Sequence, residues 1–341
     1  MAPQVFLITG TSTGFGNELV KICLSEGDKV VATARNSSKL KFDGTTKDNF
    51  LAVDLDVTEQ QSIDNAFEKA LSQFGRVDVV VNNAGYGLAG EFESLSEKQI
   101  RTQMEINFFG LLDVTRKALQ VMREVNKPQG GKIQQITSIG GQRGVPNFSL
   151  YCASKWAVEG FTEALSHELK PEWNIKLTCV EPGGFRTDWA GRSMEFGERH
   201  PAYDHMDAKK TMGIPSQSQL QIHPIANTKT GERHGTQAGD PVKGARAMCT
   251  YHPPNQPPII HMSNHLISPA QPSPSPAHPS PSVLTSIVAD IAQLPSPPLR
   301  TVIGSDAYKA IMGKIKTYGE EYPKYQELAE STDVEGYQRP T

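Results

Sequence analysis

A short apolar segment that runs directly into a glycine-rich turn is the feature that most constrains the fold of this chain. Residues 4–9 are mainly apolar, as is typical of a buried parallel strand, and Gly10-Thr11-Ser12-Thr13-Gly14-Phe15-Gly16 follows them. In residues 17–24 the apolar side chains recur at helical spacing, so the glycines occupy a strand-to-helix turn. Without Cβ atoms this backbone can approach a phosphate, and the helix N-terminus points N–H groups at it. The turn therefore predicts a dinucleotide site.

The alternation of strands and helices continues along the chain. Short β-branched segments predict strands at residues 29–34, 50–53, 77–81, 132–137 and 176–180, and helical periodicity lies between them at residues 59–74, 97–125 and 150–169. This alternation predicts a parallel sheet covered by helices on both faces. We therefore expect an α/β fold: a Rossmann-type doubly wound parallel sheet, in a single domain with Pro-rich insertions near the C-terminus. Ligands bind beyond the carboxyl ends of such strands, where Gly10, Asn82, Ser138 and Pro182 are expected.

Tyr151 and Lys155 are four residues apart in a predicted helix, so their side chains lie on the same face. A free tyrosine titrates near pH ~10, so acid-base catalysis near pH 7 requires a pKa shift of about 3 units, or roughly 4 kcal/mol. A neighbouring cation can supply part of this shift. By itself the spacing is common on helix surfaces, so the pair gains meaning only from the other motifs.

Taken together, these motifs resemble those of the short-chain dehydrogenase/reductase family. They are, in order, Gly-x-x-x-Gly-x-Gly, Asn82-Asn83-Ala84-Gly85, Asn107, Ser138, Tyr151-x-x-x-Lys155 and Pro182-Gly183. The resemblance covers about residues 4–212. Residues 82–87 and 151–165 are most similar to the branch that contains 17β-hydroxysteroid and retinol dehydrogenases.

The resemblance implies an oxidoreductase whose catalytic residues are Asn107, Ser138, Tyr151 and Lys155. Tyr151 would exchange a proton with the carbonyl or alcohol oxygen, while Lys155 would lower the pKa of Tyr151 and hold the nicotinamide ribose. Ser138 would orient the substrate oxygen, although an isolated serine could equally cap a turn. Asn107 would kink its helix and hold a water beside Lys155, which fits the poor helix propensity of asparagine.

The expected cofactor is NADP(H) rather than NAD(H). An acidic residue about 20 positions after the glycines would bind the ribose 2′-hydroxyl of NAD, whereas an arginine there can pair with the 2′-phosphate of NADP. Here the predicted second strand ends at Ala34-Arg35, without an acid. The alternative is that Arg35 is an ordinary surface cation.

Further cofactor contacts are implied by position in the family pattern. The whole set is Gly10, Thr11, Gly14, Phe15, Gly16, Arg35, Asp56, Asn83, Ala84, Gly85, Tyr151, Lys155, Pro182, Gly183, Phe185 and Thr187. Asp56 matches the adenine contact, Asn83 a residue near the adenosine ribose, and Thr187 the hydroxyl that bonds the nicotinamide carboxamide. Asp56 could instead belong to a turn before a helix. No metal site is expected.

Apolar side chains in the segments that line the substrate cleft of the family indicate the substrate class. They are Val145, Phe148, Phe185, Trp189, Met194 and Phe196. We expect an apolar ketone or alcohol of some bulk, such as a steroid, retinoid, polyketide or lipid. Apolar residues in a lid could equally serve only to pack the lid.

Composition agrees with an enzyme that acts on a small molecule. The net charge is −3 and no stretch is strongly basic, so neither nucleic acid nor anionic lipid is an expected partner. The four cysteines show no paired spacing, which is typical of a reducing compartment. The first apolar segment is too short for a signal peptide or a membrane span, so we expect a cytoplasmic protein. The resemblance implies a homodimer or homotetramer.

Beyond residue 212 the chain departs from the family pattern. Ten of its 24 prolines fall in residues 251–282, where they cannot continue a helix or a central strand. We predict a catalytic core at 1–212, an irregular insertion at 213–231, the start of a C-terminal helix at 232–249, a disordered Pro-rich insertion at 250–288, and a final helix, strand and helix at 289–330.

When both insertions are left out, the sequence on either side of them forms one continuous family pattern. This favours the hypothesis that they are translated introns or gene-model errors, and a real Pro-rich surface loop is the alternative. Two other functions stay open: a catalytically impaired NADP-binding regulator, and an interaction protein whose Pro-rich insertion binds a partner. The complete set of Tyr151, Lys155 and Ser138 favours an active reductase.

Overall fold

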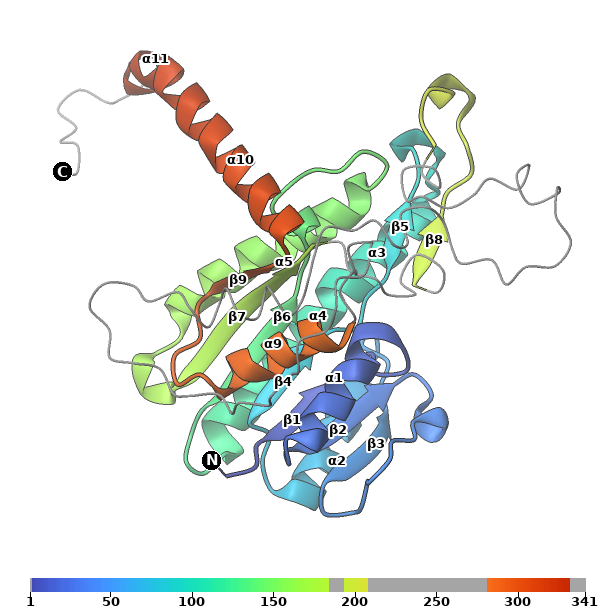
Figure 1. The fold of residues 1–341 in the computed structure, drawn as a ribbon, viewed down its shortest axis with the longest axis vertical. Helices are drawn as coiled ribbons and strands as arrows, with labels where there is room; N and C mark the ends of the chain where they lie inside the picture. The colour runs from blue at the N-terminus through green and yellow to red at the C-terminus, as the bar shows by residue number, and fades with distance from the viewer. Residues whose placement is uncertain (1, 184–192, 208–280, 332–341) are drawn as a thin grey trace, which may run out of the picture.

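The structure is a computed structural model that describes residues 2–183, 193–207 and 281–331 (Figure 1). Its main sheet has seven strands in the order β3-β2-β1-β4-β6-β7-β9, and every neighbouring pair is parallel. The strands are β1 Val5–Ile8, β2 Lys29–Ala34, β3 Phe50–Asp54, β4 Val79–Asn82, β6 Gly131–Ile136, β7 Ile175–Pro182 and β9 Arg300–Ile303. The order reverses between β1 and β4, and this reversal opens a crevice at their carboxyl ends. The predicted Rossmann-type doubly wound sheet is confirmed.

Helices cover both faces of this sheet. The long ones are α1 Gly14–Ser25, α2 Gln60–Phe74, α3 Glu97–Met104, α4 Gly110–Gln120, α5 Ser149–Glu168, α9 Pro281–Gln293 and α10 Ser305–Glu321, and a short helix α11 spans Gln326–Glu330. Two π-helical turns, η3 Glu105–Phe109 and η4 Val121–Val125, flank α4. Short 3-10 turns are η1 Ser37–Lys39, η2 Phe92–Ser94, η5 Ile139–Gly141, η6 Pro171–Trp173, η7 Pro201–Tyr203 and η9 Tyr322–Tyr325.

Strand β1 shows how the core is divided. Successive side chains of a strand point to opposite faces, so Phe6 and Ile8 pack with α1 and α9, whereas Val5 and Leu7 pack with α2, α4 and α5. All four side chains are 2% exposed or less. A strand buried on both faces must be apolar throughout, which explains the uninterrupted apolar segment at the N-terminus.

Helix α9 shows that the predicted boundary of the Pro-rich insertion at residue 288 is wrong. The helix begins at Pro281, and Ile287, Val288 and Ile291 are buried in the core that includes α1. A proline is tolerated in the first turn of a helix because no backbone N–H is needed there, so Pro281 opens this helix rather than extending the insertion. The predicted insertion at 213–231, the helix start at 232–249 and residues 250–280 lie outside the described residues.

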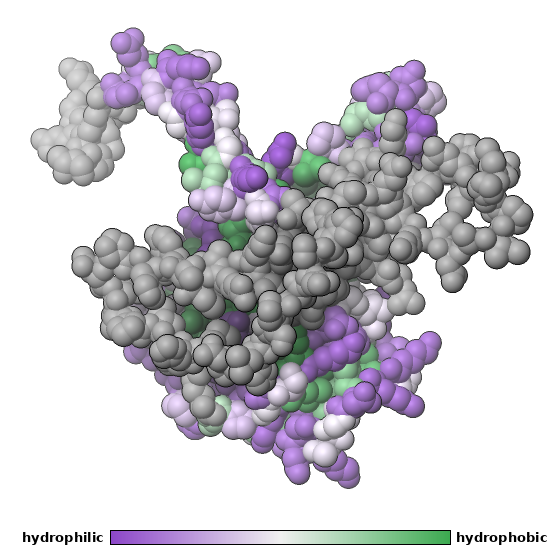
Figure 2. Space-filling view, in the orientation of Figure 1, coloured by the Kyte–Doolittle hydropathy of each residue, from purple (hydrophilic) through white to green (hydrophobic). Residues whose placement is uncertain are grey.

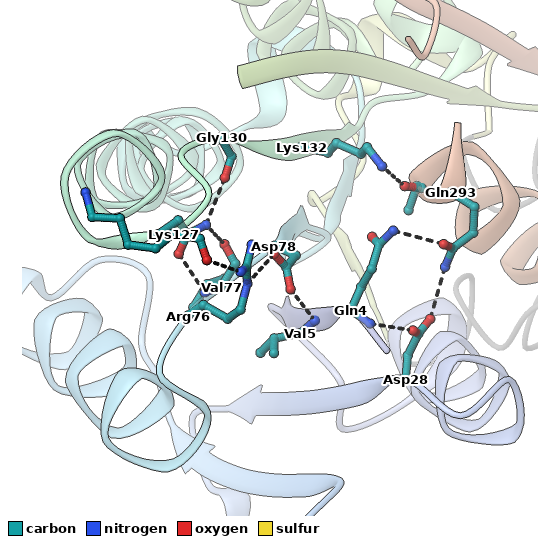
Figure 3. Close-up of polar contacts among 12 residues, drawn as sticks. Gln4, Val5, Asp28, Arg76, Val77, Asp78, Lys127, Gly130, Lys132 and Gln293 are labelled. Carbon is teal, nitrogen blue, oxygen red and sulfur yellow. Dashed lines mark hydrogen bonds and ion pairs between the residues drawn. The ribbon is translucent and has the colours of Figure 1, made fainter. Parts of the chain in front are cut away.

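Polar contacts at the amino-terminal edge of the sheet attach α9 to the first strands (Figure 3). Gln4 Nε2 donates to Gln293 Oε1 at 2.9 Å, and Gln293 Nε2 donates to Asp28 Oδ2 at 3.1 Å. Lys132 Nζ donates to the carbonyl oxygen of Ala292. These bonds join residues as far as 289 positions apart, so the last elements of the chain complete the same domain as the first.

A second, two-stranded sheet is separate from the main sheet. Strand β5 (Gly87–Ala89) pairs in parallel with β8 (Met194–Phe196), and both lie toward the same side of the molecule as α3 (Figure 1). On the other side, α10 and α11 project from the body, and their visible surface is mainly hydrophilic (Figure 2). Among the described residues, no helix is both long enough and apolar enough to span a bilayer.

Candidate active site

The glycine turn after β1 packs tightly against the segment that follows β4. Gly10 has a φ of +71° and Gly14 a φ of +58°, values that favour glycine. A Cβ atom on Gly16 would lie 2.5 Å from the carbonyl oxygen of Gly10 and from Nδ2 of Asn83. The first turn of α1 holds no acidic residue, and its N-cap Thr13 makes no side-chain cap hydrogen bond. The positive end of this helix can therefore accept a phosphate.

Thr9 and Asn83 hold the turn in place. Thr9 Oγ1 accepts from the backbone N–H groups of Asn83 and Ala84, each at 2.9 Å. Asn83 Nδ2 donates in return to the carbonyl oxygens of Thr9, at 2.8 Å, and of Gly10, at 3.1 Å. Sequence reasoning missed Thr9, whose hydroxyl at the end of β1 was the available signal. The contact of Asn83 with an adenosine ribose stays a prediction.

The end of β2 lies beside the same turn. The backbone N–H and the hydroxyl of Thr11 both donate to the carbonyl oxygen of Thr33, at 2.9 and 3.0 Å. Arg35 follows two residues later and is exposed. The backbone of Arg35 therefore follows the end of β2 that is bonded to the turn, and a contact of its guanidinium with a 2′-phosphate stays a prediction.

Asp56 belongs to a turn before α2, which was the alternative to an adenine contact. Its Oδ1 accepts from the backbone N–H of Thr58 at 3.0 Å and from the Thr58 hydroxyl at 2.8 Å. Both bonds are accepted by the same carboxylate oxygen, Oδ1. A contact of Asp56 with adenine stays a prediction.

Asn107 lies within the π-helical turn η3, where the predicted helix was expected to kink. The residue is 1% exposed, and its amide clamps Tyr86: Oδ1 accepts from the Tyr86 N–H at 3.0 Å and Nδ2 donates to the Tyr86 carbonyl at 2.9 Å. Nδ2 also approaches Ser154 Oγ at 3.3 Å. The asparagine thus joins η3 to the segment after β4 and to α5, and the irregular turn explains why a poor helix former is tolerated.

Ser138, Tyr151 and Lys155 converge at the carboxyl end of β6. The Ser138 hydroxyl is hydrogen-bonded to the Tyr151 side chain and also accepts from the Gly140 N–H at 3.1 Å, so the turn cap given as the alternative is present and the contact with the substrate oxygen stays a prediction. Lys155 is 7% exposed, and its Nζ donates to the Ile136 carbonyl at 2.8 Å and lies 5.9 Å from the centre of the Tyr151 ring. A Cβ on Gly85 would lie 3.0 Å from Asn107 Oδ1 and 3.9 Å from Lys155 Nζ. All four predicted catalytic residues therefore meet in one place.

A sequence profile of the family described as short chain dehydrogenase matches residues 4–196, which is more than half of the chain. The chain belongs to the short-chain dehydrogenase family. Its placement in the branch of the 17β-hydroxysteroid and retinol dehydrogenases stays a prediction.

Several oxidoreductases are similar to this short-chain dehydrogenase. The chain is 45% identical over 199 residues to an uncharacterized oxidoreductase of Schizosaccharomyces pombe, and the match covers 58% of the chain and 66% of that protein. It is 41% identical over 187 residues to 3-ketodihydrosphingosine reductase of Bacteroides thetaiotaomicron, covering 55% of the chain and 66% of that protein. These matches thus span slightly less than two thirds of either relative.

Solved structures agree with this assignment. A short-chain dehydrogenase from Streptomyces avermitilis superposes with a TM-score of 0.71 at 28% identity, over 98% of this chain and all of that one. A 3-ketoacyl-(acyl-carrier-protein) reductase of Brucella melitensis in complex with NADH (30% identity, TM-score 0.51) covers 55% of this chain and 78% of its own. ElxO with NADP bound (30% identity, TM-score 0.51) covers 55% and 75%. The chain therefore shares the fold of this family, and two of these neighbouring structures hold a nicotinamide cofactor.

Burial controls the acid-base properties of the dehydrogenase centre. It raises the pKa of Tyr151 to about 12, against the opposing effect of the hydrogen bond from Ser138. It lowers the pKa of Lys155 to about 8, while the carboxylate of Glu159 acts in the opposite direction. The expected lowering of the Tyr151 pKa by Lys155 is not found in this structure, because desolvation dominates and the lysine ammonium bonds to Ile136. Tyr151 is consequently protonated at neutral pH.

Tyr151 packs against a small apolar cluster. Phe148 packs edge-on against the Tyr151 ring with centroids 6.3 Å apart, and Val145, Met194 and Phe196 belong to the same cluster. Phe185, Thr187 and Trp189 lie outside the described residues, so their predicted roles stay predictions.

The end of β7 completes this side of the crevice. Gly183 donates its N–H to the Ile303 carbonyl at 2.8 Å, and a side chain on Gly183 would collide with the carboxylate of Asp306, at the start of α10. Pro182-Gly183 is therefore held against both β9 and α10, and a nicotinamide contact of this pair stays a prediction. Sequence reasoning did not identify Asp306, since it follows β9 by only a few residues and reads as an ordinary helix start.

Proposed function

We propose that this protein transfers hydride between NADP(H) and the carbonyl or secondary alcohol of a bulky apolar substrate, with Tyr151 as proton donor. One observation carries the proposal: a protonated tyrosine, bonded to Ser138 and next to Lys155, lies at the carboxyl ends of the same strands as the glycine turn. When bound, the nicotinamide supplies or accepts the hydride.

The residues of the chain supply the proton and the positioning. The hydroxyl of Tyr151, which burial keeps protonated, donates its proton to the carbonyl oxygen of the substrate. Ser138 offers a second hydroxyl within hydrogen-bond reach of the tyrosine, where it can bond the same substrate oxygen. Lys155 Nζ lies beside the Tyr151 ring, where it stabilises negative charge that develops on the phenol oxygen.

The preference for NADP(H) rests on Arg35, the exposed cation beside the glycine turn. Replacing Arg35 with alanine is expected to lower the ratio of kcat/KM with NADPH to that with NADH about 10-fold, because a charged contact to the 2′-phosphate contributes about 1.5 kcal/mol or more. Both efficiencies are measured for wild type and variant. Arg101→Ala, which removes an exposed arginine on α3 with 77% side-chain exposure, is the matched control. An unchanged ratio in Arg35→Ala would show that the arginine does not select the cofactor.

The apolar cluster of Val145, Phe148, Met194 and Phe196 supports a substrate with an extended apolar part. The name of one relative, 3-ketodihydrosphingosine reductase, indicates a ketone of this kind. Long-chain keto compounds therefore belong beside steroid, retinoid and polyketide ketones in a substrate panel.

The decisive experiment follows the absorbance of NADPH with the purified full chain and this panel of ketones and aldehydes, with Tyr151→Phe as control. Consumption that requires both a carbonyl and Tyr151 supports the proposal. Cofactor binding without turnover of any carbonyl would overturn it in favour of a binding protein, and consumption that persists in the variant would overturn the role of Tyr151. A cytoplasmic location and a homodimer or homotetramer stay predictions.

A further inference from the structure

A line of ionisable side chains continues along α5 beyond the catalytic pair. Tyr151, Lys155 and Glu159 are spaced four residues apart, so all three lie on the same face of the helix. Glu159 has a side-chain exposure of 5%, and Glu181 on β7, immediately before Pro182, has one of 1%. Burial of a carboxylate is costly unless it is paired, so two buried carboxylates behind the catalytic lysine require an explanation.

One guanidinium forms ion pairs with both of these carboxylates and with a third. Arg300, at the start of β9, places Nε 3.2 Å from Glu159 Oε2 and 3.7 Å from Glu181 Oε1. Its other nitrogen, Nη2, lies 2.6 Å from Glu163 Oε2, a carboxylate that is 51% exposed. Glu181 Oε1 also accepts from Gln142 Nε2 at 3.3 Å. Within the described part of the chain, Glu159 Oε1 is buried and has no hydrogen-bond donor.

Arg300 is shared among three carboxylates and only partly neutralises the buried pair, which favours binding of a proton by the pair. Burial raises the pKa of Glu181 to about 7, and the charge of Glu159 acts in the same direction against the opposing effect of Arg300. The proton belongs to the pair because the two carboxyl groups interact directly. Cys179 on β7 contacts the same group and stays a neutral thiol, since burial raises its pKa far above the usual range.

Glu159 acts electrostatically on the lysine and packs against the segment that follows Ser138. The Glu159 charge is the one that raises the pKa of Lys155 against the effect of burial. A Cβ on Gly141 would lie 3.1 Å from Glu159 Cγ, so the turn η5 packs directly on this side chain. Gln142, which ends that turn, also accepts from Lys314 Nζ of α10 at 2.6 Å through its carbonyl oxygen. Thus α5, β7, β9 and Gln142 at the end of η5 place charged or polar groups around the pair, and Lys314 of α10 bonds to Gln142.

We propose that Glu159 and Glu181 are positioning residues of the dehydrogenase: the buried carboxyl pair, bridged by Arg300, keeps the ammonium of Lys155 charged and fixes the turn that follows Ser138. The inference rests on the proposed reductase function for its kinetic test. Its second test, of the proton held by the pair, does not depend on activity.

Glu159→Gln is expected to move the alkaline limb of the pH profile of kcat/KM to lower pH by about one unit, because Lys155 loses the charge that keeps it protonated. Glu163→Gln is the matched control: it removes a carboxylate that also contacts Arg300 but lies two turns from Lys155, and its alkaline limb stays at the wild-type pH. A purely structural role would lower activity at all pH values without moving the limb. An unmoved limb in Glu159→Gln would overturn the proposal.

Glu181→Gln tests whether the Glu159–Glu181 pair holds a proton. The measurement is thermal unfolding of the full chain at pH 5 and pH 8. A carboxyl pKa raised by folding means that the folded chain binds the proton more tightly than the unfolded chain. Stability therefore falls as pH rises from the ordinary value of 4.5 to about 7. The variant lacks this fall, so its Tm relative to wild type is expected to be higher at pH 8 than at pH 5 by roughly 5 °C. If the Tm difference between variant and wild type is the same at both pH values, the pair does not share a proton. This result does not depend on finding a carbonyl substrate.

Discussion

A Tyr151→Phe protein is expected to turn over its carbonyl substrate about 10²–10⁴-fold more slowly than wild type while it binds cofactor normally. Phenylalanine keeps the ring that packs edge-on against Phe148, so the apolar cluster is preserved. The lost hydroxyl is the group bonded to Ser138, and with it the protein loses its proton donor. Because the proton moves in the transition state, kcat and kcat/KM fall together with little change in KM.

Two measurements separate this expectation from a folding defect. The Kd for NADPH, followed by fluorescence quenching, stays at the wild-type value, and so does Tm. Tyr308→Phe removes the hydroxyl of a tyrosine on α10 that is 58% exposed, and this control keeps wild-type turnover. A Tyr151→Phe protein that turns over as fast as wild type would assign the proton to another group.

The second large effect is expected at Gly16. A valine there is expected to weaken NADPH binding by up to about 100-fold, because its Cβ would lie 2.5 Å from the Gly10 carbonyl and from Asn83 Nδ2. The carbonyl belongs to the backbone and cannot swing away, so the turn itself must move. Such a shift would also disturb the bonds by which Asn83 and Thr9 hold the turn.

Calorimetric titration with NADPH measures this loss, and far-ultraviolet circular dichroism checks that the variant is folded. Gly313→Ala is the control, since a Cβ on this glycine of α10 meets no atom within 4 Å. Alanine is a better helix former than glycine by about 1 kcal/mol, so the control binds cofactor normally and is slightly more stable. Wild-type affinity in Gly16→Val would contradict the close approach of the turn to the pyrophosphate.

The parts of the fold that sequence analysis predicted correctly are those encoded locally. The apolar segment before the glycines, the turn and the spacing of Tyr151 and Lys155 each depend on neighbours within one element. Asn107 was informative for the same reason, because a poor helix former inside a long helical pattern indicated the irregular turn η3.

What sequence analysis could not predict depends on contacts between distant segments. The pairing of Glu159 and Glu181 with Arg300 joins three elements, and each residue alone resembles an ordinary charged side chain. The role of Asn83 in holding the turn requires the register between β1 and β4. The start of α9 was missed because Pro281 continues a proline-rich stretch in the sequence, although the apolar residues after it form a buried helix face.

Helix α9 also has a consequence for how the protein is made. On the ribosome, residues 1–183 are complete well before residues 281–303 emerge, yet these late residues cover Phe6 and Ile8 and supply the strand that carries Arg300. Until then α1 alone covers Phe6 and Ile8 on this face, so part of its apolar surface is exposed to solvent, and such surfaces are sites of aggregation and chaperone binding. A shortened chain that ends before Pro281 would therefore contain every catalytic residue named here and still fail to accumulate as a soluble protein.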